Sequence, residues 1–127
     1  MKRLIKYFVV CLIVFAGCAT QHTMVDRAMV INNTEGIISE VVIRHEPTGK
    51  IGAANMILPR NSFDLGFSKQ PLLAEEAIVS WRNQDGHHQK VKVKLSDFVE
   101  VSGKEQPGSL VYIIHPGSKV TVGLKEN

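Results

Sequence analysis

The sequence lacks the features that would stabilise a small domain covalently or carry it across a membrane. Only two cysteines occur among the 127 residues, Cys11 and Cys18. Both lie in the first 18 residues, so no disulfide is expected in the rest of the chain. The apolar run from Tyr7 to Phe15 is nine residues long, whereas a membrane-spanning helix needs about 20 apolar residues. The folded part must therefore depend on hydrophobic packing alone.

The charge balance excludes a strongly basic or acidic protein. The whole chain has 15 Lys and Arg against 12 Asp and Glu. Three of the basic residues, Lys2, Arg3 and Lys6, precede the apolar run, and without them the balance is 12 against 12. A near-neutral chain gives no reason to expect a nucleic-acid partner, which would require a basic surface.

The motifs of common catalytic sites are also missing. The sequence has no Gly-x-Gly-x-x-Gly and no Gly-x-Ser-x-Gly motif. Gly49-Lys50 lacks the earlier glycine and the hydroxyl residue that a phosphate-binding loop needs. His45-Glu46 cannot begin a zinc-binding helix because Pro47 follows it. We therefore expect a protein that is not an enzyme and has no cofactor.

The N-terminus carries the pattern of an export signal. A basic start is followed by the short apolar run and then by the small residues Ala16 and Gly17. A charged segment, an apolar segment of 7–15 residues and a small-residue cleavage site are typical of secretory signal peptides. The alternatives are an ordinary secretory signal and a core strand with an incidental cysteine.

At Phe15-Ala16-Gly17-Cys18 the chain resembles the lipobox of bacterial lipoproteins, in which a cysteine follows two small residues. Phe15 stands where Leu is most frequent in that family. The resemblance implies export, attachment of diacylglycerol to the Cys18 thiol, cleavage before Cys18 and acylation of the new amino group. Ala19 resembles the residue found in lipoproteins that are sent on to the outer membrane. The resemblance covers residues 1–18 and implies nothing about the rest.

Removal of the signal defines the domain organisation that we expect. A chain of 127 residues that loses its first 17 retains 110, which is enough for one domain and too few for two. The predicted organisation is a signal peptide over 1–17, a lipidated cysteine and short tether over 18–26, and a single domain over 27–127. The tether Ala19–Asp26 would reach at most roughly 26–29 Å when fully extended.

Short β-rich segments recur between clusters of Gly, Pro, Asn and Asp, a pattern typical of all-β proteins. The sequence predicts a two-sheet β-sandwich, immunoglobulin-like or transthyretin-like, of about seven or eight short strands. The predicted strands are Arg27–Asn32, Ile37–His45, Ile51–Leu58, Ser62–Ser68, Ala77–Asn83, His88–Leu95, Ser109–His115 and Lys119–Leu124.

Alternation and turn residues add detail to this prediction. Asp85-Gly86 between two alternating segments predicts a hairpin. Pro116-Gly117 suits a type II turn, whose twist does not match a two-residue hairpin, so we expect a longer loop there or strands in different sheets. Leu110–Ile114 is apolar on both faces and predicts a central strand. Trp81 is expected to be a core anchor, and Asn32-Asn33-Thr34 a turn rather than a glycosylation site.

Three histidines are the candidates for a metal site: His87, His88 and His115. Asp85 with His87 or His88 is the candidate acid–base pair. Neighbouring residues on a strand point to opposite faces, so His87 and His88 would converge only if the hairpin twisted them together. Adjacent histidines also lack the spacing of known zinc sites. The alternative is that they form the solvated tip of a hairpin.

A row of lysines is the candidate partner-binding site. Lys90, Lys92 and Lys94 alternate with Val91, Val93 and Leu95, so the lysines share one face and lie roughly 6.6–7 Å apart. This row could contact an acidic partner or lipid phosphates. The alternative is that the lysines solvate an edge strand and block edge-to-edge aggregation.

These patterns lead to three functional hypotheses. The first is an envelope lipoprotein, anchored in the outer membrane and facing the periplasm, whose non-catalytic sandwich binds a protein partner, as an accessory part of an envelope or secretion assembly. The second is a periplasmic inhibitor or glycan-binding module that uses loops such as Asn83–His88, or Trp81 and Tyr112 as a stacking platform. The third is a metal-assisted hydrolase built around His87, His88 and His115.

Replacing Cys18 by Ser should abolish lipidation, because the serine hydroxyl cannot take the place of the thiol that is modified. The variant should stay as the unprocessed precursor or appear in the wrong fraction. Metabolic labelling with a fatty acid measures this directly. Label retained in the Cys18→Ser chain would contradict the lipoprotein assignment.

Overall fold

A computed structural model of the chain describes residues 23–96 and 107–126 and has eight β-strands. Cys18 and the signal segment lie outside the described residues. The strands are β1 (Met24–Asn32), β2 (Ile38–Glu46), β3 (Gly49–Ile57), β4 (Ser62–Pro71), β5 (Glu76–Arg82), β6 (His88–Lys94), β7 (Gly108–His115) and β8 (Lys119–Glu126). Within the described ranges, no helix has the length and hydrophobicity that crossing a membrane requires.

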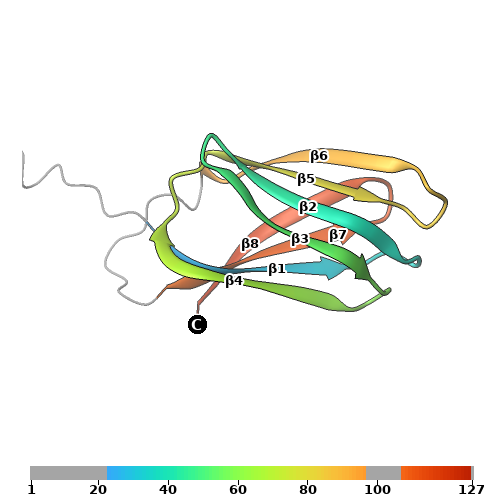
Figure 1. Cartoon of the computed structure of the whole chain (residues 1–127), viewed down its shortest axis with the longest axis horizontal. Helices are drawn as coiled ribbons and strands as arrows, with labels where there is room; N and C mark the ends of the chain where they lie inside the picture. The colour runs from blue at the N-terminus through green and yellow to red at the C-terminus, as the bar shows by residue number, and fades with distance from the viewer. Residues whose placement is uncertain (1–22, 97–106, 127) are drawn as a thin grey trace, which may run out of the picture.

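The strands form two four-stranded sheets that pack face to face, as Figure 1 shows. One sheet has the order β4-β1-β7-β8 and the other β3-β2-β5-β6. All neighbours are antiparallel except β1 and β7, which are parallel. In the immunoglobulin sandwich the first two strands share a sheet, whereas here β1 and β2 lie in opposite sheets. The predicted all-β two-sheet sandwich is confirmed, and of its two variants the immunoglobulin order is excluded.

The core lies between the two sheets and consists of every second residue of the strands. On β5, Ala77, Val79 and Trp81 are buried, while the residues between them are partly exposed. Trp81 is 1% exposed, which confirms it as a core anchor. The central strand β7 is the most apolar strand, as expected from its sequence, and it contributes Leu110, Tyr112 and Ile114 to the core.

Each strand boundary lies within three residues of the predicted one. β1 begins at Met24, three residues before the predicted strand and domain boundary at Arg27, because Met24 and Val25 pair with the end of β4 across a register shift. The shift interrupts the alternation of apolar residues and hides this part of the strand in the sequence. The β7–β8 connection has three residues, with Gly117 at φ 77°. It is longer than a two-residue turn, as expected, and it joins neighbours in one sheet.

A buried polar pair links the two sheets. His45 of β2 is 2% exposed, and its Nε2 lies 2.7 Å from the hydroxyl oxygen of Tyr112 on β7. Burial lowers the pKa of His45 from 6.5 to about 4. Burial also raises the pKa of Tyr112 above its usual value. Both side chains are therefore neutral at physiological pH, and they satisfy one another by the hydrogen bond between the sheets.

This pair predicts a pH-dependent stability. The unfolded chain binds a proton at His45 with a pKa near 6.5, and the folded chain does so only near 4. The free energy of unfolding should therefore fall as the pH falls from about 6.5 to about 4, by on the order of 2–3 kcal/mol. Urea unfolding across this pH range measures the loss. A His45→Gln variant should lack this part of the pH dependence; an unchanged profile in the variant would contradict the assignment to His45.

Candidate functional site

The structure gathers four of its strand connections at one end of the sandwich. The β1–β2, β3–β4, β5–β6 and β7–β8 connections lie at the end opposite to the start of β1 (Figure 1). The β5–β6 and β7–β8 connections join antiparallel neighbours within one sheet, whereas the β1–β2 and β3–β4 connections cross from one sheet to the other. We call this end of the sandwich the loop end. Loops on a rigid scaffold are the usual place of binding residues.

A pocket of about 360 Å³ opens at the loop end between the two sheets. Its walls come from three connections: the β1–β2 connection, which crosses between the sheets, the β5–β6 hairpin and the β7–β8 hairpin. Ile38, Trp81 and His115 line it at the ends of their strands. The loop residues that line it are Thr34, Gly36, Ile37, Asn83, Gln84, Asp85, Pro116, Gly117 and Ser118. Its volume is at the lower end of the range of small-molecule sites.

Asn32 fixes the shape of the β1–β2 wall of the pocket. It is the last residue of β1 and is fully buried. Its Nδ2 donates to the carbonyls of Gly36 and Ile57, each at 2.9 Å. Its Oδ1 accepts from the backbone N–H and the hydroxyl of Thr34, at 3.0 and 2.6 Å. One side chain thus satisfies the segment after β1 and joins it to the end of β3. The hydrogen bond from the Thr34 N–H closes the turn that the sequence predicts.

Gln84 closes the pocket against Gly36. The Oε1 of Gln84 accepts from the backbone N–H of Ile37 at 3.3 Å. A Cβ added to Gly36 would lie 2.6 Å from that oxygen, so the close approach of Gln84 requires glycine there. This contact joins the β1–β2 connection to the β5–β6 hairpin and holds the two walls in register.

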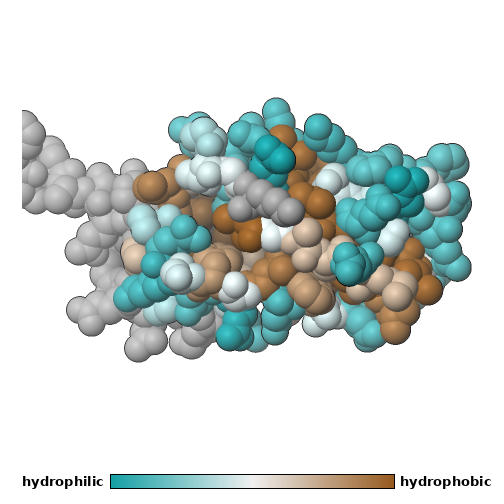
Figure 2. Space-filling model, viewed as in Figure 1, coloured by the Kyte–Doolittle hydropathy of each residue, from teal (hydrophilic) through white to brown (hydrophobic). Residues whose placement is uncertain are grey.

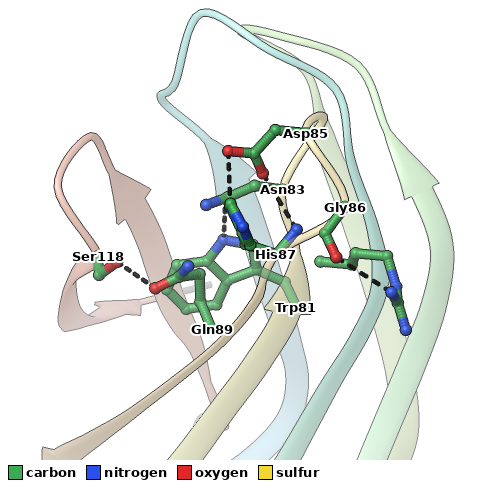
Figure 3. Close-up of polar contacts among 8 residues, drawn as sticks. Trp81, Asn83, Asp85, Gly86, His87, Gln89 and Ser118 are labelled. Atoms are coloured by element: carbon green, nitrogen blue, oxygen red, sulfur yellow. Dashed lines mark hydrogen bonds and ion pairs between the residues drawn. The ribbon is translucent and has the colours of Figure 1, made fainter.

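Trp81 and Asn83 form the β5 side of the pocket (Figure 3). The indole Nε1 of Trp81 donates to Oδ1 of Asn83 at 2.8 Å. Because Oδ1 is used in this way, the amide nitrogen of Asn83 is directed away from the indole. Ser118 of the β7–β8 connection reaches across the sheets and bonds to Gln89. The hydrogen bonds of this corner thus join residues from both sheets.

His115 is held by neighbours on both of its ring nitrogens. Nδ2 of Asn33 lies 3.4 Å from Nδ1, and Thr121 Oγ1 lies 2.8 Å from Nε2. An asparagine amide nitrogen can only donate, so Nδ1 accepts and Nε2 carries the proton. Oδ1 of Asn33 in turn accepts from the guanidinium of Arg60. His115 is therefore a hydrogen-bonded residue of the pocket wall, and both of its ring nitrogens already have partners.

Asp85 and His87 form an exposed pair at the tip of the β5–β6 hairpin. The carboxylate of Asp85 accepts from the backbone N–H of His87 at 3.1 Å and lies 3.0 Å from its Nδ1. The backbone hydrogen bond and then the side-chain contact lower the pKa of Asp85. The Asp85-Gly86 turn is closed by a bond from the Gly86 N–H to the Asn83 carbonyl at 2.9 Å, with Gly86 at φ 90°. The predicted hairpin is thus present.

The structure does not bring the three candidate histidines together. His87 faces Asp85, His88 lies opposite Arg82 in the β5–β6 ladder, and His115 is on the other sheet. Among residues 23–96 and 107–126, no group of three His, Cys, Asp or Glu side chains could hold a metal ion. The convergence that a hydrolase site would require is therefore not seen in this part of the chain.

The lysine row lies where the sequence places it. Lys90, Lys92 and Lys94 are exposed on the outer face of β6, which is an edge strand. Lys92 lies 3.6 Å from a carboxylate oxygen of Glu76 on the neighbouring strand. Glu75 lies beside the same surface. The surface is therefore of mixed sign, and its charge favours an acidic partner less than the sequence alone suggests.

The residues that shape the pocket escaped sequence reasoning for a physical reason. Gln84, Gly36 and Ser118 belong to three turns far apart in the chain, and each looks like an ordinary turn residue. Only the pairing of the strands brings these turns to one end. The loop segment Asn83–His88 was a candidate binding segment from the sequence, and its first residues do line the pocket.

Comparison with known proteins identifies no family for this chain. No protein-family model matches the sequence, and no curated protein matches it either. The NMR structure of a protein from Eubacterium rectale is similar, with a TM-score of 0.46 and 17% sequence identity, over 84% of this chain and 90% of that chain.

Replacing Asn32 by Ala should destabilise the loop end strongly. The substitution leaves the Gly36 and Ile57 carbonyls and the Thr34 N–H without their partner, at a cost of about 2–4 kcal/mol in the free energy of unfolding. Chemical denaturation measures it. Asn55→Ala is the matched control: Asn55 is exposed on β3, and its loss should change stability by less than about 0.5 kcal/mol. Equal effects of the two substitutions would contradict the role of Asn32.

Proposed function

We propose that the protein is an envelope lipoprotein, anchored by lipid on Cys18 in the outer membrane and facing the periplasm, that acts by binding a protein partner. Its binding site is the pocket at the loop end. The observation that carries this proposal is the composition of the pocket: connections from both sheets meet there and offer amide groups to a ligand. β1 begins at the end of the sandwich opposite to the pocket.

The hydrogen-bonding groups of the pocket indicate what it binds. Oδ1 of Asn83 and Oε1 of Gln84 already accept protein hydrogen bonds. Neither amide nitrogen donates to another group within the described residues, and an amide nitrogen is a donor only. The carboxylate of Asp85 also lines the pocket and repels an anion. The ligand that fits is an uncharged group with hydrogen-bond acceptors, such as the main-chain carbonyls of a partner's loop.

The other two hypotheses receive less support. A glycan-binding site would profit from an exposed aromatic ring, but Trp81 and Tyr112 are buried to 1% and 0% exposure. A hydrolase around His87, His88 and His115 would need side chains that converge, and these diverge. We therefore propose binding rather than catalysis. We assign the lysine row on β6 to solvation and protection of the sheet edge.

The single tryptophan makes this proposal testable. Trp81 is the one tryptophan of the chain and lines the pocket, so its fluorescence should report occupancy. A blocked dipeptide amide should shift the emission of the full-length protein in detergent, with an affinity of roughly millimolar for a ligand of this size. Asn83→Asp and Gln84→Glu keep the oxygen that each protein contact uses and replace the donor nitrogen. Each should weaken binding about 2–10-fold.

The control is a triple substitution of Lys90, Lys92 and Lys94 by Gln, which should leave the titration unchanged. In the producing cell, a deletion strain complemented by each variant should show the same order of effects. Binding of N-acetylglucosamine in place of the dipeptide would favour the glycan hypothesis. Loss of function in the lysine variant alone, at normal protein level, would contradict the pocket as the binding site.

A further inference from the structure

Each sheet of the sandwich has two edge strands, and three of these four edges are protected against pairing with another chain. An exposed edge offers unpaired backbone N–H and C=O groups to any other strand, and charges, bulges and proline block it. β6 carries its three lysines, and β8 carries Lys119 and Lys125, both exposed. β4 contains Asp64, ends at Pro71 and is irregular where the ladder to β1 shifts register.

The fourth edge, β3, lacks such protection from Ile51 to Ile57, beyond Lys50 and the register shift beside it. No charged residue occurs from Ile51 to Ile57. The ladder from β2 to β3 is regular from Gly52 to Ile57, without a bulge that would twist this stretch away. Among the strands that the structure describes, β2 is the only neighbour of β3. A straight, uncharged edge of this length is the kind that pairs with another strand.

Exposed hydrophobic side chains gather beside this edge. Met56 on β3 is 59% exposed, Leu58 just after it 47%, and Phe63 at the start of β4 39%. They make up three of the four large hydrophobic side chains that are exposed in the described part. Figure 2 shows hydrophobic residues along this side of the molecule and at the β3–β4 connection. Apolar side chains next to a free edge favour a partner that supplies both backbone hydrogen bonds and apolar contact.

We propose that a second copy of this chain covers the β3 edge, in an antiparallel pairing of β3 with β3 of the other copy. Two-fold symmetry requires a surface that is complementary to itself. With Ala54 at the two-fold axis, Ala53 lies opposite Asn55 of the second copy and Gly52 opposite its Met56, so no like charges meet. The same pairing of β6 centred on Lys92 would place Lys90 opposite Lys94 and is repulsive.

The size of this side of the molecule sets the strength of the dimer. A nine-residue strand is about 30 Å long, and two packed sheets with their outer side chains are roughly 20 Å thick. Each copy would then bury about 600 Å², or about 1,200 Å² in total, at the lower limit of stable interfaces. The dimer is therefore weak in solution and is favoured by confinement to a membrane surface, which raises the effective concentration.

The geometry of the dimer agrees with the position of the other features. No pocket-lining residue belongs to β3, so both pockets stay open in the pair. Antiparallel pairing puts the two starts of β1 at opposite ends of the dimer. Both tethers then reach one membrane when the strands lie along its surface.

Cysteine cross-linking of the full chain in membranes of the producing cell tests the proposal. Asn55 is exposed on β3, and Asn55→Cys in both copies would place two thiols within reach of a short bis-maleimide, since diagonal neighbours across a strand pair are about 7–8 Å apart. We expect a cross-linked dimer from Asn55→Cys and none from Thr121→Cys, an exposed position on the edge strand β8. The chain without an introduced cysteine measures any reaction of Cys18.

A charge placed on the edge should separate the copies. Adding Ala53→Lys to Asn55→Cys should lower the cross-linked fraction about tenfold or more. The added lysine of each copy would have to lie against the uncharged β3 strand of the other copy, which disfavours the pairing of the two strands. Thr121→Lys added to Asn55→Cys is the matched control and should have no effect. Equal cross-linking of the Asn55 and Thr121 thiols, no dimer from Asn55→Cys, or a dimer that Ala53→Lys leaves unchanged would each overturn the proposal. Protein level and protease resistance of each variant confirm that it is folded.

Discussion

The packing of the two sheet faces against each other is the interaction on which the stability of the domain depends. With no disulfide available to the described residues, the inward side chains of eight strands supply the stabilising interaction. Burial of apolar surface contributes about 25 cal/mol per Å², and Trp81 and Tyr112 are the largest fully buried side chains. Every other feature is placed by this contact: the loop end is where the strands turn, and the free edges are where the sheets stop.

Polar groups enter this core only where they satisfy one another. His45 and Tyr112 come from opposite sheets and form a hydrogen bond at 2.7 Å, and Asn32 uses both of its polar atoms on backbone groups or Thr34. Among the described residues, no buried side-chain nitrogen or oxygen lacks a partner. These contacts add specificity to an otherwise apolar packing, because a shifted strand would leave them unsatisfied. Asn32 also holds Thr34 and Gly36, which line the pocket.

The candidate binding pocket and the candidate dimer edge make different demands on the chain. The pocket depends on three turns that are held together by side-chain hydrogen bonds, with Gln84 seated on Gly36. The edge depends on the absence of charge from residues 51–57 of β3 and on the regular ladder to β2 over residues 52–57. The two surfaces share no residue, so a protein could bind at the loop end of each copy while the two copies remain paired.

The sequence by itself determined the strands, because apolar and polar residues alternate with a period of two within the strand segments. On β6 and just after it, for example, Lys90, Lys92 and Lys94 are exposed, whereas Val93 and Leu95 are buried. It also indicated the Asp85-Gly86 hairpin and the buried Trp81. Only the tertiary structure decided the strand order, the meeting of His45 with Tyr112, the divergence of His87, His88 and His115, and the pocket around Gln84. These depend on contacts between residues far apart in the chain, such as Asn33 and His115, which are 82 positions apart. Local patterns hold no information about which distant strand becomes the neighbour.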